Sequence, residues 1–187
     1  MVTIGALWLP ILLSGIAVWV ASARAWMVLP HHKKDVNVLP DEKVLLEHLK
    51  KMNLAPGTYM WPNCQTNAEM NSEEFKARFN TGPWGNINIV GAKPNFGRNL
   101  LLTALFYVVV SVVVAYVTGQ ANEPGASFQP VFRVAGAAGV LGYCAGSIPN
   151  AIFFSKPARF VLTDFADSLV YGPLTGATLA LLWPAAS

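Results

Sequence analysis

PVFRVAGAAGVLGYCAGSIPNAIFF (residues 130–154) and FVLTDFADSLVYGPLTGATLALLW (residues 160–183) are apolar stretches joined by the short basic turn SKPAR. About 20 apolar residues suffice for a helix to cross a membrane, so each stretch is long enough. Small residues recur at every fourth position and share one helical face. They are Ala138, Gly142 and Gly146 in the first stretch, and Ser168, Gly172, Gly176 and Ala180 in the second. Such faces let helix backbones approach closely in lipid, so the pattern predicts a tight transmembrane hairpin, with docking to another subunit as the alternative.

The composition agrees with a membrane protein that carries one polar insert. Hydrophobic residues make up 53% of the 187 residues and charged residues only 12%, whereas a soluble domain has about 25% charged residues. Most of the charges lie between residues 30 and 98. The net charge of +3 has a sufficient explanation in membrane orientation, and we find no nucleic-acid-binding motif.

Two further apolar stretches complete the predicted membrane domain. Residues 1–29 form the first, with Trp8 and Trp26 near its ends, as expected for rings at the headgroup level. Residues 99–118 form the second. We therefore expect an all-α membrane protein with four transmembrane helices, in which residues 99–187 supply helices two to four.

The polar insert, residues 30–98, has the pattern of a small α+β unit. Asp41 and Glu42 precede an amphipathic segment that ends near Asn53, which predicts a helix. Asn71, followed by Glu74, resembles a capping box that starts a second, shorter helix. Aromatic and β-branched residues flanked by Gly and Pro predict short strands at residues 57–61 and 84–90.

The loops carry an uneven distribution of basic residues that predicts the orientation. Basic residues flank the predicted helices on one side, at Lys33, Lys34, Lys93, Arg98, Lys156 and Arg159, and Arg133 near the other side is the exception. By the positive-inside rule, the insert is cytoplasmic and both termini are periplasmic, if the membrane is a bacterial inner membrane.

A charged layer is predicted within the cytoplasmic half of the bundle. At 1.5 Å per residue, Arg24 lies roughly 8 to 9 Å deep, and Asp164 and Asp167 lie about 6 and 10 Å deep. The descending third helix brings Asn150 to the same level, and Tyr171 follows Asp167 by one turn. Because charges in a membrane helix are costly, we expect Arg24 to pair with Asp167 or Asp164.

This layer has two interpretations. A structural layer fixes the register of the helices, whereas a functional one makes Asp167, with Tyr171, the proton or cation site of a small transporter. The structural interpretation is favoured, because both aspartates lie in the first two turns of one helix. The chain also lacks the internal repeat that is usual in transporters.

The histidines and cysteines do not form a recognisable motif. Adjacent residues of a helix point in different directions, so His31 and His32 are interpreted as interface histidines rather than metal or haem ligands. Cys64 and Cys144 fall in different environments and are not expected to form a disulfide. Cys64 is a weak candidate for a nucleophile. We therefore expect neither a metal nor another cofactor.

Two segments carry a resemblance. PGTYMWP (residues 56–62) and DSLVYG (residues 167–172), which runs on to LWP (residues 182–184), resemble small bacterial inner-membrane proteins without assigned function. The resemblance implies a bacterial setting and carries over no catalytic residue.

The expected function is that of a non-catalytic integral membrane subunit or accessory factor of a larger membrane complex. Its expected partners are the lipid bilayer and other proteins of that complex, and not nucleic acid. A small proton- or cation-coupled transporter or channel that uses Asp164 and Asp167 is the alternative. An enzyme acting on lipid through Cys64 or the histidines is the least supported reading.

Overall fold

The computed structural model describes residues 1 to 186 and divides into two compact units. Unit 1 comprises Met1–Asn37 together with the chain from Phe96 onward, and unit 2 comprises Val38–Asn95. The chain is mostly helical, and its described strands form one small sheet in unit 2.

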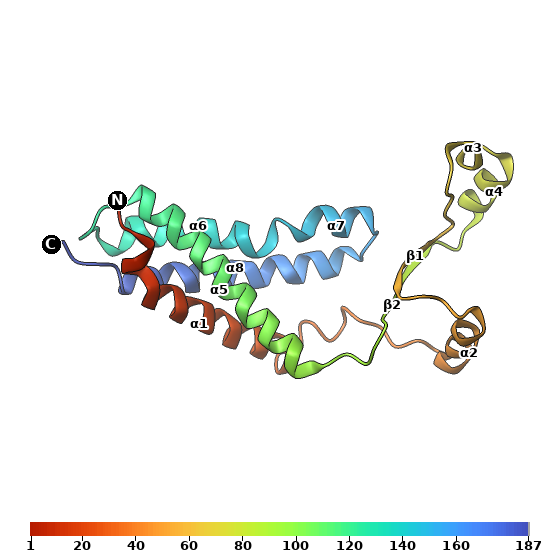
Figure 1. The fold of residues 1–187 in the computed structure, drawn as a ribbon, viewed down its shortest axis with the longest axis horizontal. Coiled ribbons are helices and arrows are strands. Elements are labelled where there is room, and N and C mark those ends of the chain that lie inside the picture. Colours follow the sequence, from red (N-terminus) through yellow and green to blue (C-terminus); the bar gives the residue numbers. More distant parts are fainter. Residues whose placement is uncertain (187) are drawn as a thin grey trace. The chain divides into compact units, whose positions relative to one another are not determined.

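Unit 1 is a bundle of long helices. Its elements are η1 (Ile4–Leu7), α1 (Trp8–Met27), α5 (Phe96–Ala121), α6 (Phe128–Cys144), α7 (Ser147–Phe153) and α8 (Ala158–Leu181). Figure 1 shows the long helices side by side, with the start of η1 and the end of α8 at the same end of the bundle. Backbone hydrogen bonds hold that end together, from Val2 N to Gly119 O (3.0 Å) and from Gly125 N to Pro184 O (2.8 Å).

Three helical segments among the described residues are long and apolar enough to cross a membrane. They are Ile4–Met27, Phe96–Ala121 and Phe128–Phe153. The sequence predicted a fourth span, but α8 does not reach the same apolarity, although it is 24 residues long. Its two aspartates, its three glycine and proline residues and its hydroxyl side chains dilute the apolar residues.

The third predicted helix, residues 130–154, is interrupted in the structure. The chain turns at residues 145–146, and α7 begins immediately afterwards. Glycine is a poor helix former, and Gly146 occupies the N-cap of α7. Pro149 lies in the first turn of α7. Backbone N–H groups in a first turn have no acceptor within the helix, so the N–H that proline lacks costs no hydrogen bond there. The break therefore follows from local sequence that a continuous apolar pattern conceals.

Helices α6 and α8 pack with their backbones in contact. A Cβ atom at Gly172 would lie 2.6 Å from Val140 N and 2.7 Å from Gly136 O. A Cβ atom at Gly176 would lie 2.9 Å from both Gly136 N and Phe132 O. Ser168 and Ala180, the other two small residues of the α8 face, are buried as well.

The face of α6 that meets α8 differs from the predicted one. Gly136 and Gly139 contact α8, whereas a Cβ at Gly142 would meet Val110 of α5 at 3.0 Å and a Cβ at Gly146 would meet nothing within 4 Å. Ala138 is only partly buried. The run Ala-Gly-Ala-Ala-Gly at residues 135–139 offers small residues on more than one face, so spacing alone does not select the one that packs.

Unit 2 is a small α+β unit. Its elements are α2 (Glu42–Met52), β1 (Gly57–Trp61), α3 (Asn67–Met70), α4 (Glu73–Thr81) and β2 (Gly85–Ile89). Strands β1 and β2 pair antiparallel, with Tyr59 opposite Ile87. Among residues 38 to 95, all of which the structure describes, Phe75 is the one buried apolar side chain.

The helix ends of unit 2 follow local rules. The side chain of Asp41 accepts a hydrogen bond from Val44 N (3.3 Å), and Asn53 ends α2 in the left-handed conformation. The cap of α4 is Ser72 and not the predicted Asn71, because the Ser72 hydroxyl accepts from Phe75 N (3.1 Å).

A candidate metal centre at the end of the bundle

The loop after α1 folds back onto the first turns of α8 and brings four titratable side chains together. Helix α1 ends at Met27, and Pro30 disfavours its continuation. Two backbone hydrogen bonds, Lys33 N to Pro30 O (3.1 Å) and Asp35 N to His32 O (3.0 Å), then turn the chain. The polar centre so formed consists of His31, His32 and Asp35 from the loop and Asp167 from α8.

Asp167 lies in the middle of the polar centre. Its Oδ1 is 2.9 Å from His31 Nε2, and its Oδ2 is 3.0 Å from His32 Nε2. Tyr171, one turn along α8, donates its hydroxyl to Asp167 Oδ2 at 2.7 Å. Asp167 is 8% exposed, so these contacts replace the water molecules that would surround a carboxylate on the surface.

His32 is held on both edges and one face. Its Nδ1 lies 2.7 Å from Asp35 Oδ2, and the indole of Trp26 stacks on its ring at a centroid distance of 3.8 Å. Burial of the ring lowers the pKa of His32, but the hydrogen bonds to Asp167 and Asp35 outweigh burial and raise the pKa above its ordinary value of 6.5. Both ring nitrogens of His32 face carboxylate oxygens. This arrangement suits a protonated imidazolium or a bound cation.

Asp35 anchors the loop to α8. Its side chain is fully buried, Thr163 donates its hydroxyl to Oδ2 at 2.7 Å, and Arg159 Nε lies 3.1 Å from Oδ1. The hydrogen bond from Thr163, together with His32 and Arg159, lowers the pKa of Asp35 below 3.8 against the opposing effect of burial. Arg159 also donates to the carbonyl oxygen of His31 at 2.7 Å.

A cluster of tyrosines continues from the polar centre into the bundle. The rings of Tyr107, Tyr143 and Tyr171 meet edge to face, with centroids 5.7 to 6.1 Å apart. Tyr107 donates to the hydroxyl of Ser22 (2.8 Å), and the hydroxyls of Tyr143 and Thr175 lie 2.9 Å apart. These four hydroxyl groups, on α1, α5, α6 and α8, thus satisfy one another in pairs.

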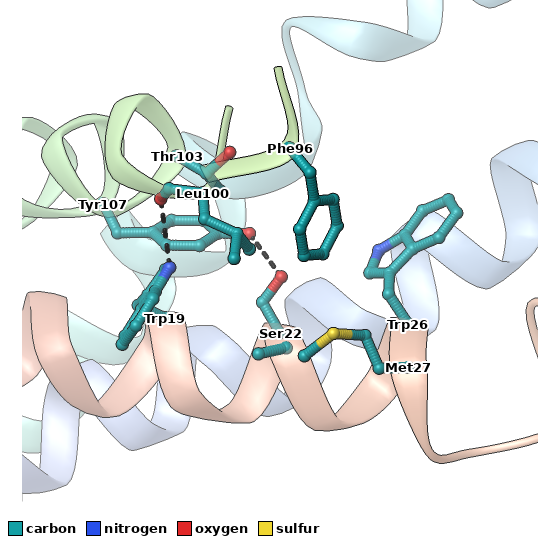
Figure 2. A pocket seen from close by; sticks show the side chains of 9 residues that line it. Trp19, Ser22, Trp26, Met27, Phe96, Leu100, Thr103 and Tyr107 are labelled. Carbon is teal, nitrogen blue, oxygen red and sulfur yellow. Dashed lines mark hydrogen bonds between the residues drawn. The ribbon is translucent and has the colours of Figure 1, made fainter. Parts of the chain in front are cut away.

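A cavity of about 270 Å³ lies beside the polar centre, between α1 and α5. Figure 2 shows the side chains that line it, among them Trp19, Ser22, Trp26, Phe96 and Tyr107. Trp26 belongs to both features, because its indole lines the cavity and also stacks on His32.

The polar centre has the ligand types of a transition-metal site. One ligand atom each from His31, His32 and Asp167 lies within 4.8 Å of the others. Two imidazole nitrogens and a carboxylate oxygen suit zinc, iron and similar divalent ions. Asp35 bonds the far nitrogen of His32, as carboxylates commonly do behind a metal-bound histidine.

The predicted charged layer is only partly assembled. Arg24 is exposed and makes no ion pair among residues 1 to 186, and it pairs with neither aspartate, contrary to the prediction. Arg24 points away from the buried face of α1 that Ser22 and Ala25 define. Asn150 is exposed on α7, and Asp164 is half-buried without a hydrogen bond to the polar centre. Of the residues in the predicted layer, Asp167 and Tyr171 form a hydrogen bond with each other.

His31 and His32 take the place that Arg24 was expected to fill. The interpretation of both as solvated or lipid-facing histidines is wrong, because both contact Asp167 and His32 is buried. The argument that adjacent residues diverge holds for a helix, whereas these two lie in a turn beyond α1. The sequence did contain a signal for this site. The cluster His-His-Lys-Lys-Asp follows the first helix, and a neighbouring helix carries an aspartate at a matching depth.

Fold and site together define a mostly helical, integral-membrane type of protein with a buried histidine–carboxylate centre at one end of its bundle. No protein-family model matches the chain, and neither the curated proteins nor the solved structures contain a match to it.

Proposed function

We propose that this chain is an integral membrane protein with four spanning helices whose polar centre binds a divalent transition-metal ion. The observation that carries the proposal is the convergence of His31 Nε2, His32 Nε2 and the Asp167 carboxylate.

The spacing of these atoms supports an ion as the shared partner. With metal–ligand distances of about 2.1 Å, ligands at 90° stand about 3.0 Å apart and tetrahedral ligands about 3.4 Å apart. The two histidine nitrogens lie 2.9 and 3.0 Å from the Asp167 oxygens. All three ligand atoms lie within 4.8 Å of one another, so the side chains would have to draw closer together to share one ion. It would replace the proton on each Nε2, while Asp35 would keep the proton on Nδ1 of His32.

The proposed orientation follows from the same end of the bundle. The polar centre adjoins the basic turn at residues 155–159, which the positive-inside rule assigns to the cytoplasm of a bacterial inner membrane. Both termini are then periplasmic. As the fourth span, α8 would carry Asp167 at a reduced cost, because its carboxylate is already bonded to His31, His32 and Tyr171.

Metal titration of the purified protein tests the proposal. After chelator treatment in detergent, cobalt(II) and zinc(II) are titrated, with the visible absorption of cobalt and calorimetry as readouts. We expect one ion per chain, and a fall in affinity of at least about 10- to 100-fold in Asp167→Asn and His31→Ala. His48→Ala is the matched control, because His48 is exposed on α2. Equal affinity in all four proteins, or no binding to the wild type, would refute the metal site.

A role as accessory subunit of a larger membrane complex stays a prediction. It is supported by three large aromatic side chains on the surface of unit 2. Trp61, Phe79 and Trp84 are between 43% and 61% exposed. Purification without overexpression, followed by native mass spectrometry, tests it. A stoichiometric second protein is expected, and a chain found alone or only with copies of itself would end this proposal.

The transport alternative is supported by a different observation, the buried carboxylate of Asp167 with hydroxyl groups continuing into the bundle. Flux of protons or metal ions into proteoliposomes tests it. Loss of flux in Asp167→Asn at unchanged abundance would favour transport, whereas absence of flux in the wild type would exclude it.

A further inference from the structure

We infer that the cavity between α1 and α5 binds the acyl chain of a bilayer lipid beside the polar centre. This inference goes beyond the proposed metal site, and the two are independent, because no metal ligand lines the cavity.

The cavity is built by two helix faces. Helices α1 and α5 touch at Gly15, where a Cβ would lie 2.9 Å from Val108 Cα. Toward the polar centre both helices supply the lining at helical spacing, which places each set on one face. The residues are Trp19, Ser22, Ala23, Trp26 and Met27 from α1, and Phe96, Leu100, Thr103 and Tyr107 from α5.

The polar groups in the wall, apart from the indole N–H of the half-exposed Trp26, already have partners. Trp19 Nε1 donates to Leu100 O (3.2 Å), Tyr107 donates to Ser22 (2.8 Å), and Thr103 donates to Asn99 O (2.8 Å). Apart from that indole N–H, what remains for an occupant is hydrocarbon. A polar ligand would lose its hydration without compensation there, whereas an alkyl chain has no hydrogen bonds to lose.

The position of the cavity identifies the hydrocarbon. Both walls belong to helices long and apolar enough to span a membrane, so lipid chains surround them. Trp26, Met27 and Phe96 are 45%, 58% and 66% exposed, so the cavity is continuous with the apolar outer surface. A protein helix, which is about 10 to 12 Å across with its side chains, is too wide for a cavity of 270 Å³. A single acyl chain can enter sideways from the bilayer.

Photo-crosslinking in nanodiscs tests the inference. The probe is a straight-chain phosphatidylcholine with a diazirine in its acyl chain, diluted into diphytanoyl phosphatidylcholine, whose methyl-branched chains compete poorly for a narrow site, and adducts are mapped by mass spectrometry. We expect saturable labelling on the lining residues Met27 and Leu100, and non-saturable labelling on outward residues such as Leu12. Saturation distinguishes a site from lipid that merely surrounds the helices. Labelling of the lining that grows without saturation would overturn the inference.

Two variants fill the cavity from opposite walls, Ala23→Phe from α1 and Thr103→Phe from α5. Each is expected to abolish the saturable labelling while leaving cobalt binding unchanged. Val20→Phe is the control, because Val20 is exposed on α1 outside the lining. His31→Ala should leave the labelling intact. Loss of metal binding and loss of lipid binding can therefore be distinguished. Saturable labelling that survives in whichever filled variant still elutes as folded protein would also overturn the inference.

Discussion

Helices α5 and α8 reverse the distribution of side chains that soluble proteins show. Helix α5 consists largely of Val, Leu, Tyr and Phe, yet its large apolar side chains are mostly exposed, and its buried positions include Ser111, Thr118 and Gly119. Helix α8 carries two aspartates and is not apolar enough to count as a span, yet it buries Asp167 and Thr175. The less apolar of the two helices is the more buried one.

The difference shows what holds the bundle together. Lipid solvates Val and Leu as well as a neighbouring helix does, so an apolar face gains little by turning inward. Small residues gain close backbone packing, and hydroxyl and carboxyl groups gain hydrogen bonds that lipid does not offer. A substitution should therefore matter far more on α8 than on the outer face of α5.

The largest effect is expected from Gly172→Val. The new Cβ would lie 2.6 Å from Val140 N and 2.7 Å from Gly136 O, so α6 and α8 would have to separate. We expect a loss of about 1–3 kcal/mol or more in the free energy of unfolding, measured by denaturant titration in detergent. Val113→Leu, on the exposed face of α5, is the control and should change stability by less than about 0.5 kcal/mol. Equal losses in the two variants would show that α8 is not the more buried helix.

The next largest effect is expected from Asp35→Asn, which keeps the shape of the side chain and removes its charge. Because Asp35 holds Nδ1 of His32, we expect metal affinity to fall about 10- to 100-fold without loss of the ligands themselves. Asp164→Asn is the control, since Asp164 lies on the same turns of α8 without a hydrogen bond to either histidine. Cobalt titration measures both. An Asp164 variant that loses as much affinity as the Asp35 variant would mean that overall charge matters and orientation does not.

A smaller effect is expected from pH on the chelator-treated protein. The raised pKa of His32 means that its contribution to stability is complete below pH 6.5 and is lost as pH rises through the folded-state value. The lowered pKa of Asp35 means that its contribution is complete above pH 3.8 and is lost as pH falls through the folded-state value. Thermal unfolding midpoints should thus be highest between these limits and decline on the alkaline side.

The histidine can be identified by substitution in the same experiment. His32→Gln should remove the alkaline decline, whereas His48→Gln, in exposed surroundings on α2, should retain it. A decline that persists in His32→Gln would assign the titration to another group.

The smallest effect concerns the arginines. Arg24→Gln should change the free energy of unfolding by less than about 0.5 kcal/mol, because Arg24 is exposed and off the buried face of α1. Arg159→Gln should cost up to about 1 kcal/mol, since the guanidinium is half exposed but contacts Asp35 and the His31 carbonyl. A larger loss for Arg24→Gln than for Arg159→Gln would restore the pairing expected from the sequence.

Local patterns predicted most of the fold. Apolar length located the helices of the bundle, and the caps at Asp41 and Asn53 fixed α2. The choice of Gly136 over Gly142 on α6 depends on tertiary packing, which spacing along one helix does not contain. The break before α7 follows from local residues, Gly146 and Pro149, that the continuous apolar pattern conceals. The sequence singled out the aspartates of α8 as costly charges within a helix. Whether the predicted partner, Arg24, reaches them depends on the direction in which α1 faces, which the sequence does not give.

The candidate site was half visible for a physical reason. Asp167 and Tyr171 lie one turn apart on one helix, so helical geometry alone brings them together. His31, His32 and Asp35 reach Asp167 through a turn, and the direction of a turn is set by contacts such as Arg159 to the His31 carbonyl. Sequence separations of 135 and 136 residues lie beyond any local rule.

The two ends of the bundle are fastened by different chemistry. At the end with the termini, the backbone amides of Val2 and Gly125 donate to Gly119 near the end of α5 and to Pro184 after α8, and the amino group of Met1 pairs with Glu123. At the opposite end, the side chains of His32, Asp35 and Asp167 hold the loop after α1 against α8. An ion bound at the polar centre would therefore fasten the end of the bundle that side chains hold, and would leave the backbone hydrogen bonds at the other end untouched.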